Sequence, residues 1–186
     1  MHTSKPHSLI RLFSLLTALS LFTGCSSMKI EDFKGQKPQL ILEDYFLGNT
    51  TAWGIFEDRF GKLKRSFKVK IDGKIIDGVL ILTEDFVYSD GETSQRVWHI
   101  TPGGNGRYTG RADDVIGLAQ GRVIGNALNW RYDLNLPVGD SVWRVSFNDW
   151  MFLQSDGVLI NKAQVRKWGL HLGTVTLFFQ SNTPNN

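Results

Sequence analysis

Residues 62–71 read KLKRSFKVKI, and this stretch decides the class of fold. Lysine or serine occupies every even-numbered position, and the odd-numbered positions are Leu63, Arg65, Phe67, Val69 and Ile71. Successive side chains of a β-strand point to opposite faces, so this alternation predicts a strand with one buried and one exposed face. The Asp72-Gly73 pair that follows is typical of a tight hairpin turn, leading into a second strand over residues 74–88.

Alternating or apolar stretches bounded by Gly, Pro, Asn and Asp recur along the rest of the chain, and none has the pattern of a long helix. Around ten antiparallel strands joined by short turns predict an all-β fold, an antiparallel up-and-down barrel of roughly 8–10 strands. A two-sheet β-sandwich is the alternative. The further strands are predicted at residues 40–47, 52–60, 96–100, 107–111, 115–124, 127–136, 141–153, 158–168 and 170–180.

The beginning of the chain predicts export. Lys5 and Arg11 precede an apolar run over residues 12–22, which is shorter than the roughly 20 residues that a membrane-spanning helix needs. Residues 21–25 (LFTGC) resemble the bacterial lipobox, in which cleavage leaves a cysteine that carries lipid. An ordinary secretory peptide with an incidental cysteine is the alternative.

We therefore expect a lipoprotein signal peptide over residues 1–24, a lipidated Cys25 with a tether over residues 25–38, and a barrel over residues 39–186. In the lipoproteins that the lipobox resembles, a serine after the cysteine implies sorting to the outer membrane. The expected location is thus the periplasmic face of the outer membrane, with the N-terminal lipid as the membrane contact.

Charge and composition exclude several classes of function. The 186 residues carry 21 Lys and Arg against 18 Asp and Glu, a net charge of +3, and loss of Lys5 and Arg11 lowers it to +1. A nucleic-acid partner is therefore not expected. Cys25 is the single cysteine, and the sequence has no zinc-binding histidine pair and no Gly-x-Ser-x-Gly motif. No catalytic residue, metal or cofactor is predicted.

Three charged residues share strand faces with apolar side chains: Arg65, Glu84 and Asp149. Because an unpaired buried charge is costly, we expect these residues to point inward with at least one salt bridge among them. A β-bulge that turns one of them to the surface is the alternative.

Two further sets of residues are predicted to line the interior, one small and one aromatic. Small residues line one strand, either leaving a cavity or making room for an aromatic ring from a neighbouring strand. The aromatic candidates for the lining are Trp98, Trp130, Tyr132 and Trp143, and the small-residue row is Val115, Gly117, Ala119, Gly121, Val123 and Gly125.

The order of several motifs resembles the bacterial lipoprotein family catalogued as domain of unknown function 3833. The resemblance covers nearly all of the mature chain, and it implies a lipocalin-like, calycin-type barrel, no established catalytic residue and a weak connection with lipids. The motifs stand at residues 53–61, at 82–92 with Arg96 and Trp98 after it, and at 108–117, 125–128 and 148–151.

The expected function is binding of an apolar or amphiphilic ligand, of the fatty acyl or phospholipid class, inside the barrel. Arg65 is the expected partner of a carboxylate or phosphate, since its planar guanidinium suits both groups. One alternative is a structural or assembly lipoprotein that meets an envelope protein through its outer surface. Another is an enzyme acting on lipid through Glu84 and Asp149.

Overall fold

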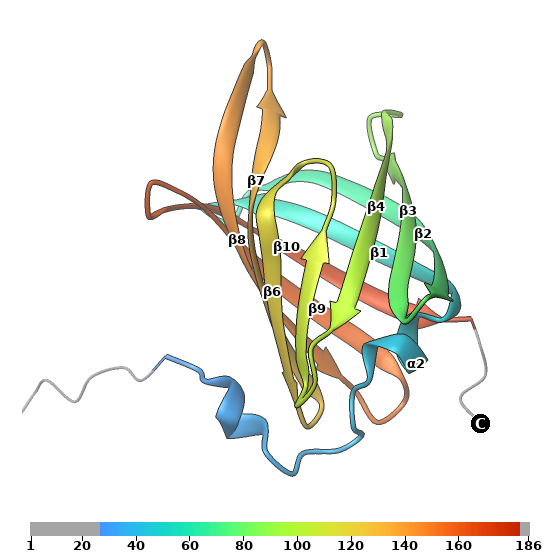
Figure 1. Cartoon of the computed structure of the whole chain (residues 1–186). Coiled ribbons are helices and arrows are strands. Elements are labelled where there is room, and N and C mark those ends of the chain that lie inside the picture. Colours follow the sequence, from blue (N-terminus) through green and yellow to red (C-terminus); the bar gives the residue numbers. More distant parts are fainter. Residues whose placement is uncertain (1–26, 183–186) are drawn as a thin grey trace, which may run out of the picture.

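The computed structural model describes residues 27–182, and most of them belong to a β-sheet (Figure 1). Two short helical segments, η2 (Ile30–Phe33) and α2 (Leu42–Phe46), precede the sheet. The strands are β1 (Gly48–Asp58), β2 (Leu63–Ile76), β3 (Val79–Tyr88), β4 (Thr93–Pro102), β5 (Arg107–Arg111), β6 (Val115–Ile124), β7 (Ala127–Val138), β8 (Ser141–Leu153), β9 (Val158–Lys167) and β10 (Leu170–Ser181).

The sheet is a closed barrel in which each strand pairs antiparallel with the next along the chain. The circle closes between β1 and β10, where Trp53 lies opposite Phe178 and Asp58 opposite Gly173. The predicted up-and-down barrel is therefore confirmed, at the upper end of the expected number of strands, and the sandwich alternative is wrong. Closure leaves no unpaired edge among the ten strands.

The hairpin predicted at Asp72-Gly73 is wrong, because β2 continues through both residues. The chain turns instead at Asp77 and Gly78, which both have positive φ (50° and 77°). Gly73 has a different role: a side chain at this position would overlap the backbone carbonyl of Phe46 in α2. The glycine thus allows α2 to approach the sheet.

The strand predicted over residues 40–47 is also wrong, because this segment is the loop that leads into α2 and then α2 itself. Leu42, Tyr45 and Phe46 are its buried residues, and their spacing places them on one side of a helix. With Leu40 they join the main core inside the barrel, together with buried residues of the strands such as Leu80. The helical segment thereby fills one end of the barrel, where β1 begins (Figure 1).

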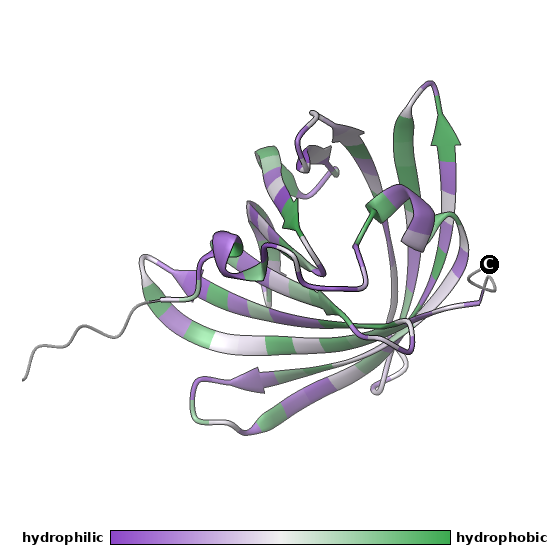
Figure 2. Cartoon of the chain, turned by 90° about the horizontal axis from the view of Figure 1, so that it is seen from below, coloured by the Kyte–Doolittle hydropathy of each residue, from purple (hydrophilic) through white to green (hydrophobic). Residues whose placement is uncertain are grey.

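Hydrogen bonds hold this segment across the base of the barrel, which Figure 2 shows from below. The Tyr45 hydroxyl donates to the carbonyl oxygen of Phe179 at 2.9 Å, and the Leu40 N–H donates to the carbonyl oxygen of Gly125 at 2.9 Å. Burial raises the pKa of Tyr45 to about 12, so its hydroxyl stays a donor at neutral pH. The opposite end has no helix over it among the described residues.

The described part of the expected tether is ordered against the barrel. Phe33 of η2 lies 5.9 Å from Trp150 and 5.4 Å from Phe152, measured between ring centroids. The predicted signal peptide over residues 1–24 and Cys25 lie outside the described residues. Within residues 27–182, no helix has the length and apolar character needed to cross a bilayer.

Candidate functional site

Five of the residues predicted for the site come together inside the barrel. Trp98 and Trp130 belong to the main core, Tyr132 packs against it, and Asp149 lies directly across the β7–β8 ladder from Trp130. Glu84 is the partner of Arg96 in the β3–β4 register. These side chains occupy the middle of the barrel, above the filled base.

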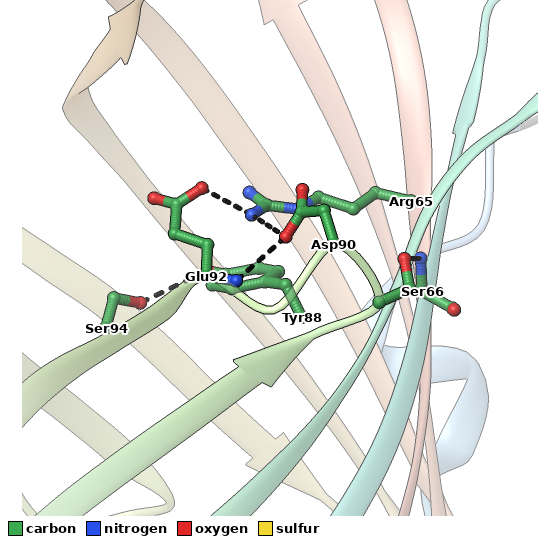
Figure 3. Close-up of polar contacts among 7 residues, drawn as sticks. Arg65, Ser66, Tyr88, Asp90, Glu92 and Ser94 are labelled. Atoms are coloured by element: carbon green, nitrogen blue, oxygen red, sulfur yellow. Dashed lines mark hydrogen bonds and ion pairs between the residues drawn. The ribbon is translucent and has the colours of Figure 1, made fainter.

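Arg65 has different partners from those predicted. Its guanidinium pairs with the carboxylates of Asp90, at 2.8 Å, and Glu92, and it lies 3.5 Å from the ring centroid of Tyr88 (Figure 3). Among the described residues no ion pair joins Arg65, Glu84 and Asp149, so the predicted salt bridge is wrong. The turn between β3 and β4 brings two carboxylates over Arg65, and these pairings raise its pKa.

Arg96 on β4 is the interior cation that the sequence analysis missed. It shares a face with the buried Trp98, two residues along the strand, and this spacing would have identified it. Its Nε donates to Asp114 at 3.1 Å and its side chain is 26% exposed. Burial disfavours the charge on Arg96, but Tyr132, Glu84 and Asp114 outweigh that effect and raise its pKa.

Three carboxyl groups interact with this one guanidinium: Glu84, Asp114 and Asp149. Burial raises the pKa of Glu84 to about 7, although Arg96 opposes the shift. Burial likewise raises the pKa of Asp149 to about 7, against the opposing effects of Asn161, Arg96 and Tyr132. The interior therefore holds more carboxyl groups than cations. Near neutral pH the two carboxyls with raised pKa values, Glu84 and Asp149, are partly protonated.

Asp149 is the most buried of these carboxyls and has polar neighbours on both sides. Asp149 is 6% exposed and Asn161 on β9 is 1% exposed. Hydrogen bonding from Asn161 and Tyr132 favours the charged form of Asp149. Burial and the nearby Asp149 raise the pKa of Tyr132 well above its ordinary value, so the phenol keeps its proton.

Three oxygens of this cluster lack a protein hydrogen-bond partner: Oδ1 of Asp114, Oδ1 of Asp149 and Oδ1 of Asn161. Each of these oxygens is buried, and each accepts hydrogen bonds when its residue is in the ordinary ionised or amide form. Buried acceptors are nearly always satisfied, so each of these oxygens needs a donor from water or from a ligand. A carboxyl oxygen can instead bind a proton itself. We define Glu84, Arg96, Asp114, Tyr132, Asp149 and Asn161 as the interior polar cluster.

Aromatic rings surround the cluster. Trp98 meets Trp130 edge-on with centroids 5.7 Å apart and meets Tyr132 at 5.4 Å. Tyr132 in turn stacks on Phe147 at 5.1 Å, toward the end of the barrel that no helix covers. The polar cluster is thus set in an apolar, largely aromatic wall.

The small-residue row does not leave a cavity at Gly121. Gly121 lies opposite Trp130 in the β6–β7 register, and a side chain at Gly121 would overlap the Trp130 ring. Ala119 is fully buried, but the register shifts between Ile116 and Gln120, and Gly117 is exposed with φ of 74°. The row therefore makes room for a ring, and the bulge removes Gly117 from the lining.

Trp143 lies apart from the polar cluster, nearer the uncovered end. It is half-buried against the smaller core of Leu134, Val145 and Val165. The Nζ atom of Lys167 lies 3.5 Å from its ring centroid. Trp143 therefore belongs to the upper wall of the barrel.

Comparison with known proteins agrees with this architecture. Residues 19–181 match the family described as "Protein of unknown function (DUF3833)". The chain belongs to this family. The match spans most of the sequence, so the resemblance found in the motifs is confirmed. No functionally curated protein matches the sequence significantly.

Two solved structures share the fold of this family member. An S-type phycobiliprotein lyase from Guillardia theta superposes with a TM-score of 0.57 at 7% identity, covering 86% of this chain and 96% of the lyase. A protein of unknown function from the DUF3598 family of Nostoc punctiforme gives 0.56 at 13% identity and 77% coverage. This chain spans 50% of the Nostoc protein. At such identities the likeness establishes a lipocalin-like barrel.

Proposed function

We propose that the barrel binds an amphiphilic ligand of the fatty acyl or phospholipid class and does not convert it. The apolar part of the ligand lies against the aromatic wall, and its polar end meets the interior polar cluster. The observation that carries the proposal is the set of three buried oxygens without a protein donor in Asp114, Asp149 and Asn161. A few placed polar groups in an apolar cavity are typical of small-molecule sites.

The chemistry of the cluster restricts the polar end of the ligand. Three carboxyls face one guanidinium, so a further anion, such as an ionised carboxylate or phosphate of the ligand, would be repelled. A hydroxyl, an amide, an ammonium or a protonated carboxylic acid supplies the donor that the unpartnered oxygens need. Arg65 is less suitable than expected as an anion partner, because an incoming anion must displace Asp90 and Glu92.

Native mass spectrometry of a chain from Ser26 to Asn186, purified from bacteria without detergent, tests the proposal. This chain contains every strand and both cores of the barrel. We expect a stoichiometric adduct that organic extraction identifies as a lipid with a donor group. Asp149→Asn should lower its occupancy at least severalfold, because an amide replaces one acceptor oxygen with a donor.

Asp133→Asn is the matched control, since Asp133 pairs with Arg144 at an exposed position on the same hairpin and should leave the occupancy unchanged. If the native mass is that of the chain without a ligand, and added fatty acids and phospholipids do not change it, the proposal is overturned. That result would favour the assembly alternative, in which the outer surface meets an envelope protein. Turnover of an added lipid that disappears in Glu84→Gln would instead indicate an enzyme.

We also propose that Cys25 carries the lipid that holds the protein on the periplasmic face of the outer membrane. The lipobox-like LFTGC sequence and the following serine support this proposal. Cells grown with radiolabelled palmitate should label the wild-type chain and fractionate it with the outer membrane. Cys25→Ser should abolish labelling and leave no outer-membrane association that withstands a high-salt wash. A Cys25→Ser chain that still sediments with the outer membrane after this wash would contradict the proposed anchor.

A further inference from the structure

Two neighbouring hairpins at the uncovered end of the barrel carry the same chemistry at their tips. The β1–β2 tip reads Arg59-Phe60-Gly61, and the β9–β10 tip reads Lys167-Trp168-Gly169. Phe60 is 80% exposed and Trp168 is 88% exposed. Because β1 pairs with β10, the two tips lie beside each other on the rim.

Trp168 has a backbone conformation that its side chain does not favour. Its φ is +51°, followed by +80° at Gly169, a pair of angles for which asparagine and glycine are the usual residues. A bulky residue in this region is rare. Folding alone would favour asparagine here, so a largely exposed indole at this position indicates a contact made outside the barrel.

Cations flank both rings. The guanidinium carbon of Arg59 lies 4.7 Å from the centroid of Phe60, and the Nζ of Lys167 lies 4.6 Å from the centroid of Trp168. Residues 57–64 and 164–171 together hold five cations, against two carboxylates, Glu57 and Asp58. The Asp58 carboxylate accepts the N–H groups of Phe60 and Lys62, at 3.0 and 3.1 Å, within its own turn.

We propose that these two tips dock the barrel on a bilayer that contains anionic lipid, with Phe60 and Trp168 at the headgroup level. Aromatic rings flanked by lysine and arginine are typical of the membrane–water interface, and each cation near an anionic surface strengthens binding. The neighbouring hairpin between β3 and β4 carries Asp90 and Glu92, and both carboxylates pair with Arg65, so their charge is already balanced beside the tips. The docking does not depend on which ligand the barrel holds.

Flotation with vesicles tests the proposal on the chain from Ser26 to Asn186, which lacks Cys25. We expect binding to phosphatidylcholine vesicles that contain phosphatidylglycerol and little binding to phosphatidylcholine alone. Lys62→Gln should weaken binding about fivefold, the effect of one cation near an anionic surface. Trp168→Asn should weaken it roughly tenfold or more, through loss of a buried ring.

Trp168→Asn is expected to fold at least as well as the wild type, because asparagine suits a positive φ, and a thermal melt verifies this. Ile76→Asn is the matched control, since Ile76 is 52% exposed next to a hairpin turn at the filled end, and should bind like the wild type. Equal binding to both kinds of vesicle, no binding at all, or unchanged binding by Trp168→Asn would overturn the proposal. A barrel that fails this test but retains a co-purified lipid would leave the ligand site standing.

Discussion

Arg96→Met is expected to lower the free energy of unfolding by about 1–4 kcal/mol at pH 8, between the effects of removing one partner of an exposed and of a buried ion pair, because the Arg96–Asp114 pair is partly buried. Methionine keeps much of the volume of the side chain but leaves Glu84, Asp114 and Asp149 without their shared cation. The loss should be smaller at pH 5, where the carboxyls with raised pKa values are protonated. Urea unfolding at both pH values measures the two losses.

Arg144→Met is the control for this experiment. Arg144 pairs with Asp133 on the outside of the β7–β8 hairpin, and its side chain is 68% exposed. Exposed pairs of this kind contribute about 0–1 kcal/mol, so this variant should stay close to the wild type at both pH values. If Arg96→Met unfolded at the same urea concentration as Arg144→Met, the cluster would not depend on its cation.

The stability of the wild-type barrel is expected to fall as the pH rises from about 5 to 8. Glu84 and Asp149 have folded-state pKa values of about 7, above their values in the unfolded chain, so the folded state binds more protons in this window. Unfolding is then favoured by rising pH, with a slope of up to about 1.4 kcal/mol per pH unit for each carboxyl. Urea unfolding at one-unit intervals gives the slope.

Asp149→Asn should flatten this dependence and make the variant more stable than the wild type at pH 8, because the amide does not ionise. Asp133→Asn provides the contrast: hydrogen bonding to Ser146 and the pairing with Arg144 lower the pKa of Asp133. Its contribution is therefore lost only in acid, and its removal should leave the slope between pH 5 and 8 unchanged. A wild-type stability that is constant or rises over this range would contradict the protonation of the interior.

The alternation of side chains along each strand predicted the barrel well, because a two-residue period is a local property of the chain. The errors came from contacts between distant residues. The apolar spacing of Leu42, Tyr45 and Phe46 fits both a short buried strand and one helical turn, and the barrel base decides between them. Asp72-Gly73 has the composition of a turn, but Gly73 is needed for the approach of Phe46.

The site was predictable in part for the same reason. The alternation along the strands placed Glu84 and Asp149 in the interior, and it would also have placed Arg96 on the same inner face as Trp98. The partners of Arg65 depend on how the turn at Asp90 folds back, which alternation does not describe. The small-residue row was misread at Gly117 because the register with β7 shifts between Ile116 and Gln120, and alternation alone does not locate such an irregularity.

The filled base has a consequence for the kinetics of binding. Leu40, Tyr45 and Phe46 pack into one end of the barrel and close that end. Under the proposed function, a ligand bound above the base would enter and leave through the same, uncovered end. Binding of a new ligand would then have to wait for release of the previous one.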